Sequence, residues 1–329
     1  MESGLSEKRA LILGISGQDG TYLARHLLDQ GYCVFGSSRD AHRANWTSLE
    51  RLGIRDRVRL ISITLTDFRS VLQALVQVEP HEVYNLAGQS SVGLSFEIPV
   101  ETLESIAGGT LHLLEAIRFL KAPIRLYNAC SSECFGDTGR CPADEETRFR
   151  PRSPYAVAKA AAFWEVANYR EAYNLYACSG ILSNHESPLR PQRYVTQKVI
   201  AAACRIAAGL ETHVELGDIS IARDWGWAPE YVVAMHRMLQ QNRPDDYLVA
   251  TGETHRLQDF VATAFSTVGL DWQNHVRFDE SLRRPTEIRE SRLNPKKARD
   301  VLGWSAQMRM PDVVRAMIQA WREAAGLPA

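Results

Sequence analysis

The first half of the chain alternates short apolar runs with amphipathic stretches. Five apolar runs predict strands, at Ala10–Leu13, Cys33–Phe35, Val58–Ile63, Glu82–Leu86 and Leu126–Ala129. Helical spacing of apolar residues predicts helices between or after them, at Tyr22–Gln30, Ser70–Val78, Gly109–Phe119 and Ala156–Ala172. Continuous apolar strands separated by helices are typical of a parallel sheet covered on both faces. Because such crossovers are right-handed, the pattern predicts an α/β fold with a doubly wound, Rossmann-type parallel sheet.

Beyond residue 180 the pattern becomes less regular. Residues 184–193, 216–224 and 283–292 are polar and predict loops, with apolar helices expected at Val195–Gly209 and Tyr231–Gln240. We therefore predict a Rossmann domain over residues 1–180. A smaller, mainly substrate-binding lobe is expected over residues 181–329, with some segments returning to the main sheet.

A glycine-rich loop follows the first predicted strand and reads GISGQDG, from Gly14 to Gly20. Glycines permit a tight turn and a close approach of the backbone to a pyrophosphate, and a helix N-terminus supplies N–H donors to an anion. Since this loop also opens a predicted helix, it predicts a dinucleotide site rather than a plain glycine turn. The expected contacts come from Gly14, Ser16, Gly17, Gln18, Asp19 and Gly20.

The end of the second predicted strand bears on which dinucleotide binds. An acidic residue there favours the ribose hydroxyls of NAD, but this chain has Arg39 with Arg43 close behind. Arginine suits a 2′-phosphate, so we predict NADP. Asp40 opposes this prediction by its charge, and the alternative is that both arginines are surface charges.

A candidate catalytic set lies at two places in the chain. Tyr155 and Lys159 share one face of a predicted helix, where an ammonium favours ionisation of the phenol for acid–base chemistry. Ser131 and Glu133 follow the fifth predicted strand, at the sheet edge where ligands bind. A carboxylate there suits removal of a proton from carbon, which a simple alcohol dehydrogenase does not need. The alternative for Glu133 is a loop or helix-cap acid.

Composition argues against several other classes. The net charge is −1 over 329 residues, so nothing predicts nucleic-acid binding. No apolar run reaches the roughly 20 residues of a membrane span, and the N-terminus does not read as a signal peptide. The six cysteines form no zinc-type spacing, so we expect reduced thiols, no metal and a cytoplasmic location.

With these motifs the chain resembles the extended short-chain dehydrogenases/reductases and, more narrowly, the GDP-mannose 4,6-dehydratases. The resemblance covers nearly the whole chain. It rests on Gly14–Leu23 (GISGQDGTYL), Glu82–Ser90 (EVYNLAGQS), Ser95–Pro99 (SFEIP), Arg150–Lys159 (RPRSPYAVAK), Gly180–Arg190 (GILSNHESPLR), Arg223–Gly226 (RDWG), Tyr247–Glu253 (YLVATGE) and Arg284–Ile288 (RPTEI).

The resemblance implies a mechanism with internal hydride transfer. Tyr155 removes the proton of the sugar 4-hydroxyl while NADP+ takes the C4 hydride, and Glu133 then removes the C5 proton. The 6-hydroxyl leaves as water, and the hydride returns to C6. Ser131 stands where the family usually has threonine, and either hydroxyl can bind the reacting oxygen.

The resemblance also implies binding residues and assembly. Cofactor contacts are expected from Arg39, Arg43, Thr64, Leu65, Leu86, Ala87, Gly88, Gln89, Ser90, Tyr155, Lys159, His185 and Arg190. Contacts with the GDP-sugar are expected from Ser90, Ser131, Glu133, Asn184, Val195, Lys198, Leu216, Gly217, Arg223, Arg284 and Glu287. The family implies a homodimer or homotetramer.

Departures from the family pattern keep more than one function open. This chain has Thr64 where the family usually has Asp, Gly88 where it has Ala, Glu101 where it has Tyr, Gln197 where it has Arg and Asp218 where it has Asn. It also has Ile106-Ala107 where the family has Asp-Gly, and Ser38-Arg39-Asp40 where the family has two adjacent arginines. A close GDP-sugar such as a GDP-heptose is therefore a second possible substrate. An epimerase or 4-keto reductase of the same fold is a rival interpretation, and so is a catalytically weakened NADP-binding sensor or scaffold.

Overall fold

The chain forms two compact units in the computed structural model, which describes residues 7–326. The first unit contains residues 7–134, Ser153–Ile181 and Val232–Tyr247. The second contains Phe135–Arg152, Leu182–Tyr231 and residues 248–326. The chain thus crosses between the units several times.

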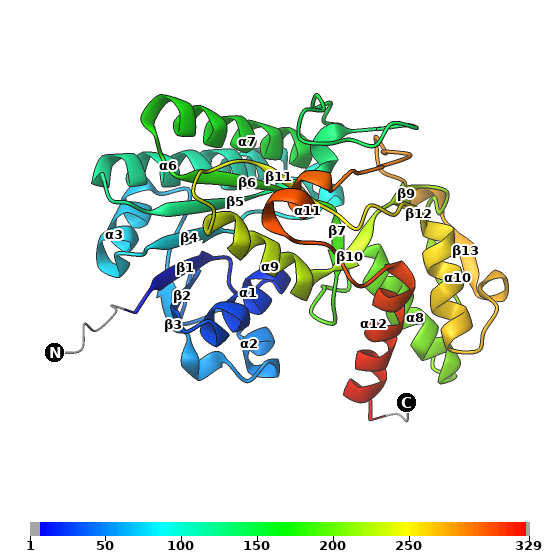
Figure 1. Cartoon of the computed structure of the whole chain (residues 1–329). Coiled ribbons are helices and arrows are strands. Elements are labelled where there is room, and N and C mark those ends of the chain that lie inside the picture. Colours follow the sequence, from blue (N-terminus) through cyan, green and yellow to red (C-terminus); the bar gives the residue numbers. More distant parts are fainter. Residues whose placement is uncertain (1–6, 327–329) are drawn as a thin grey trace. The chain divides into compact units, whose positions relative to one another are not determined.

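A seven-stranded sheet with the order β11-β6-β5-β4-β1-β2-β3 contains strands β1 to β5 and most of β6 from the first unit, and its edge strand β11 comes mainly from the second (Figure 1). Its strands are β1 (Arg9–Leu13), β2 (Cys33–Ser38), β3 (Arg59–Ser62), β4 (Glu82–Asn85), β5 (Arg125–Ser131), β6 (Ala177–Leu182) and β11 (Tyr247–Val249). Strands β1 to β5 pair in parallel, with Leu13 beside Asn85 and Asn85 beside Asn128. The predicted doubly wound α/β fold is confirmed.

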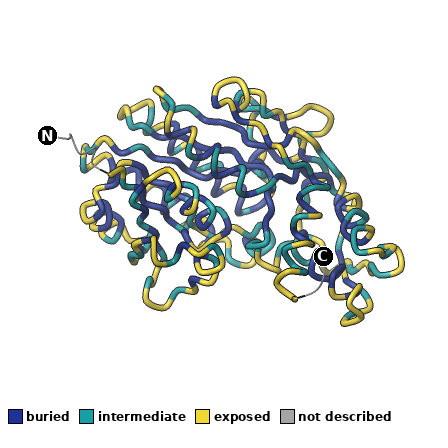
Figure 2. Tube along the Cα trace, turned by 60° about the horizontal axis from the view of Figure 1, so that its bottom comes forward, coloured by how far each residue is buried: buried dark blue, intermediate teal, exposed yellow. Residues whose placement is uncertain are grey.

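Helices cover both faces of this sheet. They are α1 (Gln18–Asp29), α2 (Thr47–Arg51), α3 (Phe68–Val78), α4 (Val92–Ser95), α5 (Pro99–Leu103), α6 (Gly109–Leu120), α7 (Pro154–Tyr173) and α9 (Ala228–Leu239). Figure 1 shows α3, α6 and α7 on one face and α1 on the other. Strand residues such as Leu11 and Val83 pack with Leu75 and Leu113 in the core, and Figure 2 shows buried strands between exposed turns. This burial of apolar surface stabilises the layers.

Several elements begin earlier or end later than predicted. Helix α1 begins at Gln18 instead of Tyr22, because Gly17 is extended and precedes the first helical turn. Strand β2 continues to Ser38, and α3 begins at Phe68, where the Asp67 side chain caps the helix. Short 3-10 turns at Arg55–Arg57 and Ser132–Phe135 and a π-helical turn at Glu104–Gly108 complete the unit.

The second unit has its own helical core. Helices α8 (Val195–Ala207), α10 (Leu257–Thr267) and α12 (Met310–Ala324) pack around Val199, Phe260 and Val313. Three strand pairs accompany them: β7 (Asn184–Glu186) with β10 (Trp225–Trp227), β9 (Ala222–Arg223) with β12 (His255–Arg256), and β8 (Val214–Leu216) with β13 (Val276–Phe278). Helix α11 (Lys296–Leu302) and 3-10 turns at Trp272–Asn274 and Glu280–Leu282 lie between these elements.

The prediction of plain loops at residues 184–193 and 216–224 was wrong in part. Both segments contribute residues to β7, β8 and β9, strands of two or three residues. Strands this short carry too few residues to show an alternating pattern. No helix among residues 7–326 is long and apolar enough to cross a membrane.

Candidate active site

Strand β5 ends at the first two candidate catalytic residues. Ser131 is its last residue, and Glu133 lies in the 3-10 turn that follows. The Ser131 hydroxyl accepts a hydrogen bond from the Glu133 backbone N–H at 3.2 Å, which fixes the turn. Because β5 is central in a parallel sheet, this turn lies at the carboxyl edge, where such sheets bind ligands.

Helix α7 supplies the other two residues. The Ser153 hydroxyl accepts from the Ala156 N–H at 3.1 Å and Pro154 occupies the first turn, so the helix start is firmly set. Tyr155 therefore lies in the first turn, and Lys159 lies one turn later on the same face. The Lys159 ammonium lies 5.8 Å from the centroid of the Tyr155 ring.

Lys159 also joins the helix to the catalytic strand. Its ammonium donates to the Ala129 carbonyl at 2.6 Å, and the residue is 8% exposed. Burial lowers the pKa of this ammonium, while the nearby thiols of Cys130 and Cys134 oppose the shift. Ser131, Glu133, Tyr155 and Lys159 thus belong to one strand end and one helix start within a single unit.

Two departures from the family pattern meet beside Tyr155. Ile106, Ala158 and Ala162 pack in one buried cluster with the tyrosine. Gly88 has a φ of +112°, and a Cβ there would lie 3.0 Å from Cγ1 of Ile106. The isoleucine fills the space that a larger residue at position 88 needs, so the two departures compensate each other.

The glycine loop has the geometry of a dinucleotide cradle. Gly14 has a φ of +81°, and a Cβ on Gly20 would lie 2.5 Å from the Gly14 carbonyl oxygen. The loop therefore packs against the first turn of α1 closely enough that only glycine fits. This leaves the helix N-terminus open toward an anion, an arrangement that fits a pyrophosphate.

The loop after β2 uses Asp40 to hold its own backbone. The Asp40 carboxylate accepts from the N–H groups of His42 at 2.9 Å and Arg43 at 3.2 Å. The Ser62 hydroxyl accepts from the Ala41 N–H at 3.0 Å. Arg39 and Arg43 are exposed on this loop. The carboxylate thus accepts two backbone hydrogen bonds that hold the loop.

The other predicted cofactor residues of the first unit follow β3 and β4. The Thr64 N–H donates to Ser70, and the Leu65 carbonyl lies 2.8 Å from Nδ1 of His112. The Gln89 amide donates to the Ser91 carbonyl at 2.8 Å and to Thr102 at 3.2 Å, so it supports the loop itself. Leu86, Ala87, Gly88 and Ser90 belong to the same loop after β4. Their contacts with a cofactor remain predictions.

In the second unit, His185 lies on a buried polar support. Its Nδ1 is 2.7 Å from the Ser183 carbonyl, and its ring stacks on Tyr231 at 4.6 Å between centroids. A Cβ on Gly226 would lie 2.4 Å from this tyrosine ring. The glycine of the RDWG stretch is therefore explained by the tyrosine that supports His185. Arg190, the other predicted cofactor residue of this unit, lies 3.2 Å from the Glu186 carboxylate.

Three predicted substrate residues form one cluster. Arg223 pairs with Glu287 at 2.9 Å and donates to the Ile288 carbonyl at 2.8 Å, and Arg284 lies 3.4 Å from the same carboxylate. Sequence reasoning missed the neighbouring Asp224. Its buried carboxylate accepts from Ser183 at 3.0 Å and from the N–H of Thr251 at 3.0 Å. The RDWG pattern contained this residue but gave no sign of its partners.

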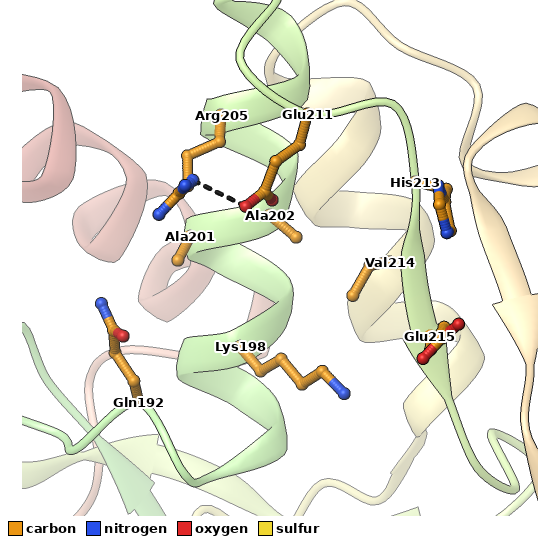
Figure 3. A pocket seen from close by; sticks show the side chains of 9 residues that line it. All are labelled: Gln192, Lys198, Ala201, Ala202, Arg205, Glu211, His213, Val214 and Glu215. Carbon is orange, nitrogen blue, oxygen red and sulfur yellow. Dashed lines mark ion pairs between the residues drawn. The ribbon is translucent and has the colours of Figure 1, made fainter.

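Lys198 lines a hollow of about 410 Å³ in the second unit (Figure 3). The side chain extends from α8 into the space before β8, where Glu215 lies. The other lining residues are Gln192, Ala201, Ala202, Arg205, Glu211, His213 and Val214. Val195 begins α8, Asn184 begins β7, Leu216 ends β8, and Gly217 follows it. The roles of these residues toward a substrate remain predictions.

Comparisons with known proteins agree with this arrangement. The family model of GDP-mannose 4,6 dehydratase matches residues 11–317. GDP-mannose 4,6 dehydratase 1 of Arabidopsis thaliana is 45% identical over 321 residues, which cover 94% of this chain and 89% of that protein. GDP-mannose 4,6-dehydratase of Sinorhizobium fredii is 43% identical over 95% of this chain and 96% of its own length.

A solved structure shows the same fold in another enzyme. UDP-glucose 4-epimerase of Thermus thermophilus, in complex with NAD, has a TM-score of 0.84 and 26% identity, over 96% of this chain and 99% of that one. The fold alone therefore does not separate a dehydratase from an epimerase. The two classes are separated by the family match over residues 11–317 and by the two relatives above 40% identity. By these comparisons the chain belongs to the GDP-mannose 4,6-dehydratase family.

Proposed function

We propose that this chain is a hydro-lyase that converts GDP-mannose, or a close GDP-sugar such as a GDP-heptose, to the 4-keto-6-deoxy sugar nucleotide. The observation that carries the proposal is the position of Glu133, two residues after Ser131 at the end of β5. Tyr155 and Lys159 suffice for oxidation of an alcohol, but only a further carboxylate explains removal of a carbon-bound proton and loss of water.

Each residue has a distinct part in this reaction. Tyr155 removes the proton of the 4-hydroxyl, with Lys159 stabilising the phenolate by its charge. A dinucleotide held by the Gly14–Gly20 loop would supply hydride transfer between C4 and C6. Ser131 donates a hydrogen bond to the C4 oxygen, and the resulting ketone acidifies the C5 hydrogen. Glu133 removes that proton and delivers it to the departing 6-hydroxyl. C5 then takes up a proton from water and Tyr155 returns its proton to water, so the product differs from the substrate by one water.

The direct test is turnover of GDP-mannose by the purified, NADP+-loaded protein, followed by mass spectrometry. Loss of one water from the sugar nucleotide is expected. An unchanged mass with a new sugar epimer would instead establish an epimerase. Binding of GDP-mannose with no chemical change in any GDP-sugar offered would support the role of a sensor or scaffold.

We further propose NADP as the resident cofactor, with Asp40 as a support of the loop that binds it. Asp40→Asn keeps an acceptor for the two backbone N–H groups, so we expect the affinity for NADP+ to stay near that of the wild type. Asp40→Ala removes the acceptor for these two N–H groups. Such a side-chain cap contributes about 1 kcal/mol, so roughly a fivefold loss of affinity for NADP+ is expected. Titration of the cofactor-stripped protein with NADP+ and NAD+ measures both.

The two substitutions separate two roles of Asp40. If the carboxylate repelled a 2′-phosphate, Asp40→Asn would bind NADP+ more tightly than the wild type. Preferred binding of NAD+ by the wild-type protein would overturn the cofactor assignment itself. Asp56→Asn removes an exposed carboxylate from a 3-10 turn and serves as the control.

We propose that two copies associate through α6 and α7. Phe119 on α6 is 67% exposed, and Trp164 and Val157 on α7 are 61% and 49% exposed. An apolar face of this kind on neighbouring helices is typical of a protein interface. Val157 and Trp164 are seven residues apart on α7 and therefore lie on the same side of the helix.

We expect Trp164→Asp to weaken this association. Loss of a central aromatic residue typically costs about 2 kcal/mol or more, roughly a 30-fold rise in the dissociation constant. Light scattering over a dilution series measures the mass. Phe278→Asp, at a 63% exposed aromatic residue in the second unit, is the matched control. An assembly that resists Trp164→Asp but dissociates with Phe278→Asp would move the interface to the second unit.

We also propose a cytoplasmic location. All six cysteines of the chain lie among the described residues, and all six are free thiols. Free thiols are typical of a reducing compartment. Fractionation of the source cells, with the protein detected in the cytosol, tests this proposal.

A further inference from the structure

Two buried thiols lie on either side of the catalytic turn. Cys130 precedes Ser131, and Cys134 follows Glu133 by one residue. Their sulfur atoms are 3.8 Å apart, and the residues are 3% and 0% exposed. A disulfide needs a sulfur–sulfur distance of about 2.05 Å, so the two sulfur atoms must move closer by somewhat less than about 2 Å. The dehydration mechanism uses neither thiol.

Both thiols also contact the start of the catalytic helix. The Cys134 thiol donates to the Ala156 carbonyl at 3.6 Å, and the Cys130 sulfur lies 3.9 Å from the Lys159 carbonyl. A disulfide has no S–H donor, so both contacts are lost when it forms. The disulfide would also pull the two ends of the segment that holds Ser131 and Glu133 closer together. A change at the sulfurs is therefore transmitted to the residues on both sides of the site.

We propose that Cys130 and Cys134 form a peroxide-responsive dithiol that closes to an intrachain disulfide and disables the catalytic turn. The Cys130 thiolate attacks hydrogen peroxide, its O–O bond breaks, and a sulfenic acid and one water form. The Cys134 sulfur then attacks the sulfenic sulfur and releases a second water. Two thiols and one peroxide thus give one disulfide and two waters, with the sulfurs oxidised and the peroxide reduced.

The order of attack follows from the surroundings of the two sulfurs. Burial raises the pKa of the Cys134 thiol well above its ordinary value, so this thiol stays protonated in the resting protein. Cys130 is 3% exposed and Cys134 is 0% exposed, so Cys130 is the more accessible of the two sulfurs to a molecule as small as peroxide. Cys130 is therefore the first site of oxidation and Cys134 the resolving thiol. Closure is expected to be faster at higher pH, because the thiolate is the nucleophile.

The test treats the whole protein with hydrogen peroxide and follows intact mass, peptide links and dehydratase activity. The wild type is expected to lose two hydrogen atoms in a Cys130–Cys134 link and about 100-fold in activity, the cost of a misplacement on the order of 1 Å. Dithiothreitol is expected to restore the original mass and the activity. Cys134→Ala is expected to accumulate a sulfenic acid at Cys130 that dimedone traps, without a link. This thiol chemistry is observable even if the protein turns over no GDP-sugar.

Control variants keep the proposal open to contradiction. Cys141→Ser removes the exposed thiol and is expected to respond as the wild type does. Cys130→Ala and Cys130→Ser are each compared with their own untreated activity, so a loss of basal rate does not obscure the result. The proposal is overturned if peroxide inactivates both Cys130 variants as it does the wild type. Failure of the link to form before the protein unfolds would overturn it too.

Discussion

Glu133→Gln is expected to stop the loss of water while leaving oxidation at C4 in place. Glutamine keeps the size of the side chain but cannot remove a proton from C5 or deliver one to the departing hydroxyl. General acid–base groups contribute about 10²- to 10⁴-fold, and Glu133 serves in two steps, so a fall of on the order of 10³-fold or more is expected. Tyr155 and Lys159 remain to act on the 4-hydroxyl.

The intermediate makes this prediction specific. Quenching with borodeuteride traps a 4-keto sugar with deuterium at C4, and mass spectrometry separates it from dehydrated product. In deuterated water, the C5 hydrogen is expected to exchange in the wild type but not in Glu133→Gln. Glu171→Gln, at an exposed position of α7, is the control. Water loss at the wild-type rate in Glu133→Gln would assign Glu133 to the turn alone and transfer the C5 chemistry to another residue.

Lys159→Met is expected to lower turnover by about 10²- to 10⁴-fold at neutral pH. Methionine retains much of the apolar stem but removes the ammonium that favours ionisation of Tyr155. Without this charge the phenol loses its proton only at higher pH, so the acidic limb of the pH–rate profile should move upward. The Ala129 carbonyl also loses its donor, so part of the loss reflects positioning.

The pH profile separates these two contributions. A loss of rate with an unshifted profile would show that Lys159 holds β5 and α7 together without acting on the phenol. Burial lowers the pKa of Lys159 itself, so in the wild type the ammonium's help is expected to disappear at the alkaline end of the profile. Lys121→Met, at an exposed lysine, is the matched control.

Local sequence was sufficient to predict the fold class and five of the seven strands of the main sheet, but not β6 or β11. The apolar runs marked the strands, and the glycine loop and the Tyr155–Lys159 spacing are features of neighbouring residues. The support of His185 was not predictable in this way, because Ser183, Asp224 and Tyr231 meet only through folding. The same holds for Gly88 and Ile106, which appear as separate departures in the sequence but occupy one space in the structure.

The division of residues between the units has a consequence for how this enzyme class can diversify. Ser131, Glu133, Tyr155 and Lys159 all belong to the first unit, whereas Asn184, Val195, Lys198, Leu216, Gly217, Arg223, Arg284 and Glu287 all belong to the second. The proposed catalytic residues and most of the proposed sugar-nucleotide contacts, apart from Ser90, Ser131 and Glu133, therefore lie on separate segments of one chain. Recombination or drift confined to residues 182–231 and 248–326 can produce a new substrate range while the reaction type is preserved.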